Sequence, residues 1–457
     1  MTDASISTIS APPMIIQGAQ VLLPSGELAQ REVAIADGKI TAVGIGLEVS
    51  ASTQTIDAEG LTLLPGIIAP HVTLCATKHI NQDSLLAHSS AYAQGGITSF
   101  LWVPHLSQLE TTRLVSSRLV SSEAQAAQAH PSEKTLEDSS LINYGFFISA
   151  ADDLAKLSKE IPSCCGLYLS VGDSRQGSLS TGSLSAEEIA KIERLFAEGD
   201  RLIVLQRDQA SEESALVAIE LALKLSKQHK RRLHILNLST ATEIALVQTY
   251  KPSWISVECT LGNLLSNLSE DDDFSPSLIQ SEPLGRALEQ GTIDCIAADC
   301  TAADCTAADC IAPDRAADRA ADYADSPYSP CSPSITETSL PLLLTQAQEG
   351  RCSVVQVSRW LSTAVARVYG ISHKGLIEPG YDADFVLVDL QTYRPVRREE
   401  LQTGAFGNEP SQDEPSPYEG WPLTGWPVIT ISGGQVVYDR GETDRSVRGR
   451  ALQFDAN

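Results

Sequence analysis

The segment Thr62–Cys75 reads TLLPGIIAPHVTLC. The apolar run that ends at Leu64 is followed by a Pro65-Gly66 turn and by a second apolar run, which ends at His71. In a parallel α/β barrel, a buried strand that ends on a histidine delivers that side chain to the carboxyl face of the sheet, where such folds bind their ligands. The segment therefore predicts a barrel with His71 at its functional face.

Strand patterns occur on both sides of this segment. Before it, alternating apolar runs at 14–23 and 32–44 contain an Asp-Gly turn at 37–38, which predicts a hairpin. Near the end of the chain, 383–388 predicts a strand and Val428–Tyr438 a second hairpin. Strands from both termini can pair only if the long middle of the chain is inserted between them.

The middle of the chain alternates helical segments with short apolar runs, as a parallel barrel requires. The predicted helices include Ser84–Gln94 and Ser214–His229. The predicted strands are Ile97–Val103, Leu233–Leu238, Ile255–Thr260 and the run Gly291–Ala298. The pattern places the chain in the α/β class.

Composition narrows the classes of partner and compartment. The 457 residues carry a formal net charge of −25, which disfavours nucleic-acid and anionic-membrane partners because phosphates would be repelled. No run approaches the roughly 20 apolar residues that span a bilayer, and no signal peptide opens the chain, so we expect a cytoplasmic protein. The ten cysteines are then expected to be reduced thiols.

Cys295–Asp325 is of low complexity: C(I/T)AAD repeats with a period of five residues are followed by RAAD and YAD repeats with a period of four. So few short copies cannot build a core, and the simplest interpretation is a lengthened loop after a barrel strand. An acidic, alanine-rich helix that contacts a partner is an alternative. The C-x4-C spacing is not that of a zinc knuckle.

Three segments carry a resemblance to a known family. Thr62–Cys75 resembles LPGxIDxHxHxR, the signature that opens the barrel of the amidohydrolase superfamily in its dihydroorotase branch. Lys374–Asp389 resembles the family's KGxIxPGxDADxVLxD, and Gly291–Ala303 resembles GTIDxIATDHAPH. The resemblance implies a TIM-type (β/α)8 barrel beside a composite β-sandwich built from both termini.

The implied domain limits follow from these segments. Residues 1–13 are predicted to be a disordered leader, 14–64 and 375–457 the composite β-sandwich, and 65–374 the barrel. Residues 295–334 are predicted to be a low-complexity loop insertion within the barrel.

The resemblance also implies a catalytic centre, in which two metal ions activate a shared hydroxide. Of the six implied ligand positions, His71 and Asp299 keep a donor, and Asp299 would also be the base. The other four ligand positions are substituted, by Thr73, Tyr168, Asn237 and Gly262. The implied substrate-binding positions are substituted as well, by Cys75, His105 and Ala303. The repeat leaves the register open, because Asp304 or Asp309 could occupy the place of Asp299.

Two main hypotheses follow. In the first, the chain is a dihydroorotase homologue that has lost hydrolysis and needs no cofactor, with Asp299 a vestige of the base. Inactive dihydroorotases in some bacteria are structural partners of aspartate transcarbamoylase, which would place this chain in pyrimidine biosynthesis as a homo-oligomeric scaffold. In the second, it is an active cyclic-amide hydrolase with an altered zinc centre at His71 and Asp299.

Two further possibilities stay open. Cys75 could pair with His79, His88 or His105 as a nucleophile and its base. The altered pocket could also bind a small molecule as a sensor.

Overall fold

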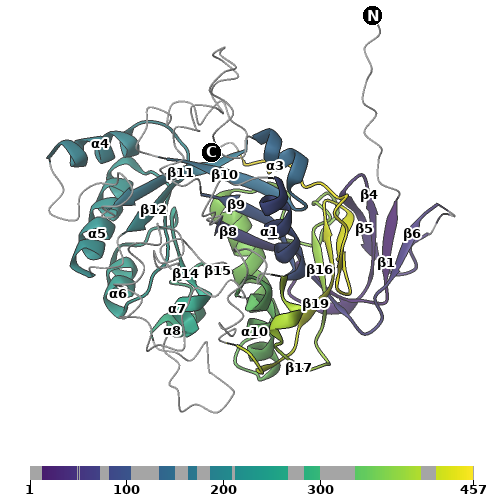
Figure 1. Ribbon diagram of the computed structural model, residues 1–457. Coiled ribbons are helices and arrows are strands. Elements are labelled where there is room, and N and C mark those ends of the chain that lie inside the picture. The colour runs from purple at the N-terminus through teal and green to yellow at the C-terminus, as the bar shows by residue number, and fades with distance from the viewer. Residues whose placement is uncertain are drawn as a thin grey trace, which may run out of the picture.

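The computed structural model describes residues 13–48, 50, 52–72, 82–103, 133–149, 163–171, 186–207, 212–265, 283–298, 335–402 and 418–455. Figure 1 shows a barrel of parallel strands with helices on its outside, and two further sheets against one flank. None of the helices in these ranges combines the length and apolar character that a bilayer crossing requires.

The barrel is one continuous ladder of eight parallel strands in chain order, β8 to β15. β15 also lies against β8, so the sheet is close to closure. The strands are β8 (Ile67–Val72), β9 (Ile97–Trp102), β10 (Asn143–Ser149), β11 (Cys164–Val171), β12 (Ile203–Arg207), β13 (Leu233–Ile235), β14 (Ile255–Thr260) and β15 (Cys295–Ala297). The predicted barrel is confirmed.

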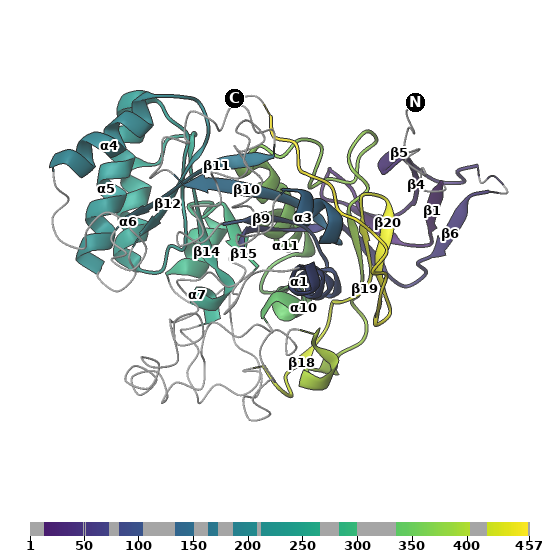
Figure 2. The same cartoon turned by 45° about the horizontal axis from the view of Figure 1, so that its top comes forward.

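Helices alternate with these strands. In Figure 2, α4, α5 and α6 cover one side of the barrel, while α1 and α10 lie between the barrel and the neighbouring sheet. The helices are α1 (Gln82–Gln94), α3 (Glu133–Ser139), α4 (Ala186–Ala197), α5 (Glu212–His229), α6 (Ala241–Tyr250), α7 (Leu261–Leu265), α8 (Leu284–Glu289), α10 (Ile335–Gln348), α11 (Val354–Ser358), the π-helix η5 (Arg359–Thr363), α12 (Ala364–Tyr369) and the 3-10 helix η6 (Arg398–Glu400).

The two flanking sheets contain strands from both ends of the chain. One sheet has the order β5-β4-β1-β6, with strands Lys39–Gly44, Glu32–Ala36, Met14–Gln17 and Gln54–Asp57. The other has the order β21-β20-β19-β16-β7-β2-β3, with strands Glu442–Thr443, Gln435–Asp439, Trp426–Ser432, Phe385–Asp389, Thr62–Pro65, Gln20–Leu22 and Leu28–Gln30. A small ribbon pairs β17 (Arg394–Pro395) with β18 (Pro422–Leu423). The antiparallel pairing of β7 with β16 confirms that the barrel is inserted between paired terminal strands.

The predicted hairpins form for the expected physical reason. Asp37 and Gly38 both have positive φ, 53° and 77°, as the two-residue turn between β4 and β5 requires. Gly433 and Gly434 do the same between β19 and β20. The exact domain limits remain predictions, with one correction. Cys295–Ala297 form β15, so the loop insertion cannot begin at 295; the segment predicted as a leader lies outside the described residues apart from Pro13.

A buried ion pair explains part of the Lys374–Asp389 motif. The Lys374 ammonium contacts the Asp384 carboxylate, and Asp384 also accepts hydrogen bonds from Asn143 Nδ2 at 3.0 Å and from the Gly433 amide at 2.7 Å. Because Asn143 begins β10 of the barrel and Gly433 lies in the β19–β20 turn, the network joins the barrel to the flanking sheet.

Candidate functional site

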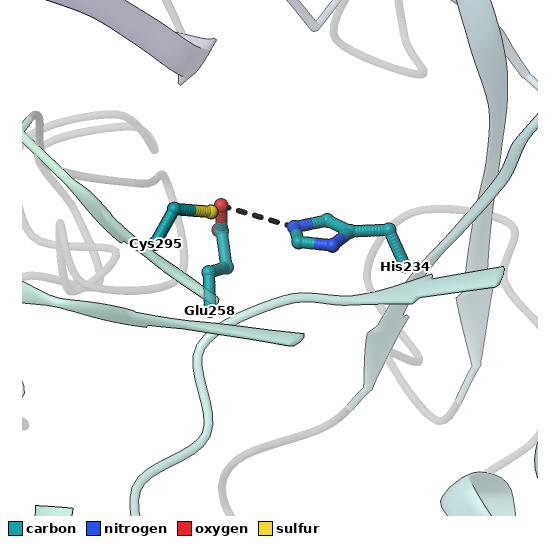
Figure 3. A group of neighbouring side chains, drawn as sticks. All are labelled: His234, Glu258 and Cys295. Carbon is teal, nitrogen blue, oxygen red and sulfur yellow. Dashed lines mark ion pairs between the residues drawn. The ribbon is translucent and has the colours of Figure 1, made fainter. Parts of the chain in front are cut away.

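Three polar side chains lie close together inside the barrel. His234, Glu258 and Cys295 come from the adjacent strands β13, β14 and β15, and Figure 3 shows them converging. Glu258 and Cys295 are register partners, and their neighbours in sequence pack outward against the helices. Because strand side chains alternate between faces, the three residues point inward. One ligand atom of each lies within 4.8 Å of those of the other two, and all three residues are fully buried.

His71 contacts the same carboxylate from the end of β8. Its Nδ1 lies 2.8 Å from Glu258 Oε1, while His234 Nε2 lies 3.1 Å from Oε2. Both contacts are at ion-pair distance, although neither aligns as a hydrogen bond. Glu258 is therefore held between two imidazoles, and the histidine that we expected at the functional face is engaged within the barrel.

The charges in this cluster are strongly coupled. Burial by itself would raise the pKa of the Glu258 carboxyl, but the positive charges of His71 and His234 outweigh burial and hold that pKa at about 2. Burial raises the pKa of the Cys295 thiol well above its ordinary value, and the nearby carboxylates of Glu258 and Asp294 raise it further. In the metal-free protein Glu258 is thus ionised and Cys295 is a neutral thiol.

Packing closes the cluster off and fixes one of its rings. His234 Nδ1 lies 2.8 Å from Ser256 Oγ, which directs the other ring nitrogen, Nε2, toward Glu258. The Tyr369 ring, from α12, stacks edge-on against His234 at 5.2 Å and against Phe147 at 5.8 Å. A substrate therefore has no exposed edge of His234 or Glu258 to approach.

The family ligand positions that the structure describes do not converge on a two-metal site. The Tyr168 ring packs in the barrel interior at 6.0 Å from Phe147. The Asn237 side-chain amide lies after β13, 3.5 Å from Gln206 Oε1, and Gly262 is buried in α7 with no donor atom to offer. Tyr168, Asn237 and Gly262 offer neither an imidazole nor a carboxylate, so together with His71 they do not fit the two-metal group that the family implies.

The remaining predicted site residues lie outside the described residues: Thr73, Cys75, His79, His105, Asp299, Ala303, Asp304 and Asp309. The predicted pairing of His71 with Asp299 therefore stays a prediction. Of the Cys–His alternative the structure describes only His88, on α1, where burial lowers the pKa of the imidazole to about 4.

Another buried ion pair, between Arg207 and Glu243, lies at the strand ends near Asn237. Arg207, at the end of β12, donates to Glu243 Oε1 at 2.6 Å and to the carbonyl oxygen of Asn237 at 2.7 Å. Asn237 has a φ of +55°, and the arginine fixes that turn through the carbonyl. The Glu243 side chain also completes the capping box that begins α6.

Sequence reasoning gave His234 no role and read Cys295 as one cysteine of the repeat. It interpreted Glu258 as a barrel residue with a hydrogen-bond partner, and the structure gives that side chain two ion-pair partners. The sequence does carry one signal for this cluster. In the otherwise apolar runs LHI and ISVECT, His234 and Glu258 occupy positions that face the barrel interior, where polar residues are unusual.

Comparisons with known proteins agree with this architecture. The family model described as "Amidohydrolase family" matches residues 279–437. A dihydroorotase of Lactobacillus helveticus is 24% identical over 439 residues, covering 92% of this chain and 97% of the relative. An allantoinase of Streptomyces avermitilis is 25% identical over 410 residues, covering 82% and 86%.

Among solved structures, a dihydropyrimidinase from Brevibacillus agri superposes with a TM-score of 0.72 at 20% identity, covering 97% of this chain and 100% of that one. Its likeness to this chain concerns the fold. The match to the family model and the distant relatives show that this chain is similar to the cyclic amidohydrolase branch of the amidohydrolase superfamily.

Proposed function

We propose that this chain is a non-catalytic relative of the dihydroorotases and that it serves pyrimidine biosynthesis as a structural partner of aspartate transcarbamoylase. The observation that carries the proposal is that, among the family ligand positions within the described residues, only His71 offers an imidazole or a carboxylate. Its Nδ1 is engaged by Glu258 Oε1 at 2.8 Å, so at most one nitrogen of that ring could bind a metal at the barrel mouth.

The chemistry of the substituted positions supports the same proposal. A hydrolytic metal centre normally needs three protein ligands and an open position for water. Tyr168 is a phenol packed on Phe147, and a phenol cannot be carbamylated to bridge two metals. Asn237 offers a neutral amide, which is a weaker ligand than imidazole, and Gly262 offers none.

The intact framework supports a structural role. The ion pair between Lys374 and Asp384 still joins the barrel to the flanking sheet, and the terminal strands still pair. The substitutions therefore change the positions that bind metal in the family, while the fold that an assembly partner would contact is retained.

An activity assay tests the loss of hydrolysis. The purified chain, with and without added zinc, is given dihydroorotate and its ring-opened form, carbamoyl aspartate, and the His71→Ala and Asp299→Ala variants are assayed beside it. We expect the same background rate for all three proteins. Zinc-dependent turnover that disappears in either variant would instead establish the second hypothesis, an active hydrolase with an altered centre.

A mixing experiment tests the partnership. The chain and aspartate transcarbamoylase from the same organism are run separately and together on size exclusion with light scattering. We expect the mixture to form a species heavier than either component, with a fixed molar ratio. Elution of the two proteins at their separate masses, over the micromolar range, would refute the partnership without bearing on the loss of hydrolysis.

A further inference from the structure

We propose that His234, Glu258 and Cys295 form a structural zinc site inside the barrel, distinct from the two-metal position that the family uses. The ligand atoms would be His234 Nε2, one carboxylate oxygen of Glu258 and Cys295 Sγ. None of these three residues occupies a position at which the resemblance implies a metal ligand. The inference is independent of the proposed function, because a metal enclosed here does not require the chain to be active or inactive.

The donor set points to zinc. One nitrogen, one oxygen and one sulfur ligand suit a borderline-soft cation and suit magnesium or calcium poorly. Ligand atoms around tetrahedral zinc lie about 3.3–3.8 Å apart, given bond lengths of about 2.0–2.3 Å. His234 Nε2 and Glu258 Oε2 are already 3.1 Å apart, and all three atoms are within 4.8 Å. Side-chain movements of about 1 Å bring them to coordination distance.

The buried polar atoms of the cluster supply a second, independent observation. Within the described residues, His234 Nε2 and both oxygens of Glu258 are fully buried and lack an aligned hydrogen bond. Buried polar atoms in folded proteins nearly always have a well-aligned partner, and a bound ion is one kind of partner. A cation between His234 and Glu258 would satisfy both groups.

Neighbouring residues are arranged as positioning residues for such a site. Metal-binding histidines usually hydrogen-bond through the other ring nitrogen, and His234 Nδ1 has Ser256 Oγ at 2.8 Å. A ring that donates from Nδ1 leaves the Nε2 lone pair for the metal. His71 Nδ1 holds Glu258 Oε1, which leaves Oε2 for the metal.

Enclosure makes the site structural. His234, Glu258 and Cys295 are each fully buried, and Tyr369 covers His234. Three protein ligands leave one coordination position of tetrahedral zinc for a further ligand such as water. On binding, zinc replaces the proton of the Cys295 thiol, which passes to solvent, and it coordinates the His234 imidazole through the Nε2 lone pair. The metal would then cross-link β13, β14 and β15, the last three strands before the barrel closes.

Cobalt substitution tests the site on the unmodified chain. The full-length protein is freed of metal with a chelator and titrated with zinc alone, or with cobalt(II) alone. We expect one tightly bound equivalent per chain, and in the cobalt form a near-ultraviolet absorption from sulfur-to-metal charge transfer. A cobalt form without that absorption, or a chain that retains no metal, would overturn the proposal.

Variants locate the metal. Cys295→Ser should abolish the charge-transfer absorption, while Cys259→Ser, which changes a buried cysteine of the adjacent strand whose side chain packs outward, should leave it unchanged. Ser256→Ala should weaken zinc affinity about 10- to 100-fold without removing the absorption. If Cys295→Ser does not fold, the presence or absence of the charge-transfer absorption in the cobalt form of the wild-type protein still tests the proposal. Equal metal binding by the Cys295→Ser and wild-type proteins would refute the site.

Discussion

Replacing His71 by alanine tests whether this residue stabilises the barrel or serves only as a metal ligand. In the metal-free protein, a ligand histidine at an open barrel mouth would stabilise the fold little. The His71 side chain is instead only 2% exposed and lies 2.8 Å from Glu258 Oε1. His71→Ala therefore removes one partner of a buried ion pair and leaves the carboxylate with His234 alone.

The magnitude follows from that geometry. Breaking a buried pair by removing one partner typically costs about 3–5 kcal/mol, because the remaining charge stays buried. We expect His71→Ala to lower the free energy of unfolding by this amount, measured by urea unfolding at pH 5.5 in the presence of a chelator. Glu258→Gln should cost a similar amount. The free energy of unfolding of the double variant should exceed the value expected from adding the two single losses by about 2 kcal/mol. The reason is that Glu258→Gln removes the carboxylate that His71→Ala leaves with one partner fewer.

His373→Asn is the matched control. His373 is exposed, and its nearest aromatic neighbour, Tyr381, lies at a ring distance of 6.0 Å. This variant should change the free energy of unfolding by less than about 1 kcal/mol. If His71→Ala is as stable as the wild type in chelator, or if the losses of His71→Ala and Glu258→Gln simply add, the structural role assigned to His71 is wrong.

Three other predictions follow from buried polar contacts. Asp384→Asn should destabilise the chain by about 3 kcal/mol in urea unfolding, because the buried Lys374 ammonium then keeps only its second partner, Asp382 Oδ2 at 3.0 Å. A loss below about 1 kcal/mol would contradict the assigned network. Burial alone would raise the pKa of Glu243, but the charge of Arg207 and the hydrogen bonds that Glu243 accepts lower that pKa below 4.5. The pair therefore stabilises the fold above pH 4.5, and this stabilisation is lost as the pH falls and Glu243 is protonated. Glu243→Gln should accordingly flatten the acid side of the stability profile, and an unchanged profile would count against the pair. Thr240→Ala removes the capping box of α6 and should cost about 1 kcal/mol in the same assay.

Local sequence was sufficient where local physics decides the structure. The turn at Asp37-Gly38 follows from the positive φ that a two-residue hairpin needs, and the run Ile97–Trp102 follows from its continuous apolar character. The helix predicted at 214–229 begins two residues earlier, at Glu212, since acidic residues favour a first turn.

The interior cluster depends on register between distant strands, which spacing along the chain does not give. Glu258 faces Cys295 only because β14 and β15 pair with that offset, and His71 reaches Glu258 only because the barrel curves back toward its first strand. The repeat composition around Cys295 also concealed that its first residues form a strand. For a similar reason the sequence does not indicate Arg207, since helix α5 and strand β13 separate it from its partner Glu243 along the chain.

Locating zinc by anomalous diffraction, in crystals of the zinc-loaded chain, tests most directly whether the barrel has exchanged the family's catalytic centre for an enclosed structural one. We predict a single peak between His234, Glu258 and Cys295. A pair of peaks at the carboxyl face of the barrel, with His71 and Asp299 among the ligands, would contradict that prediction.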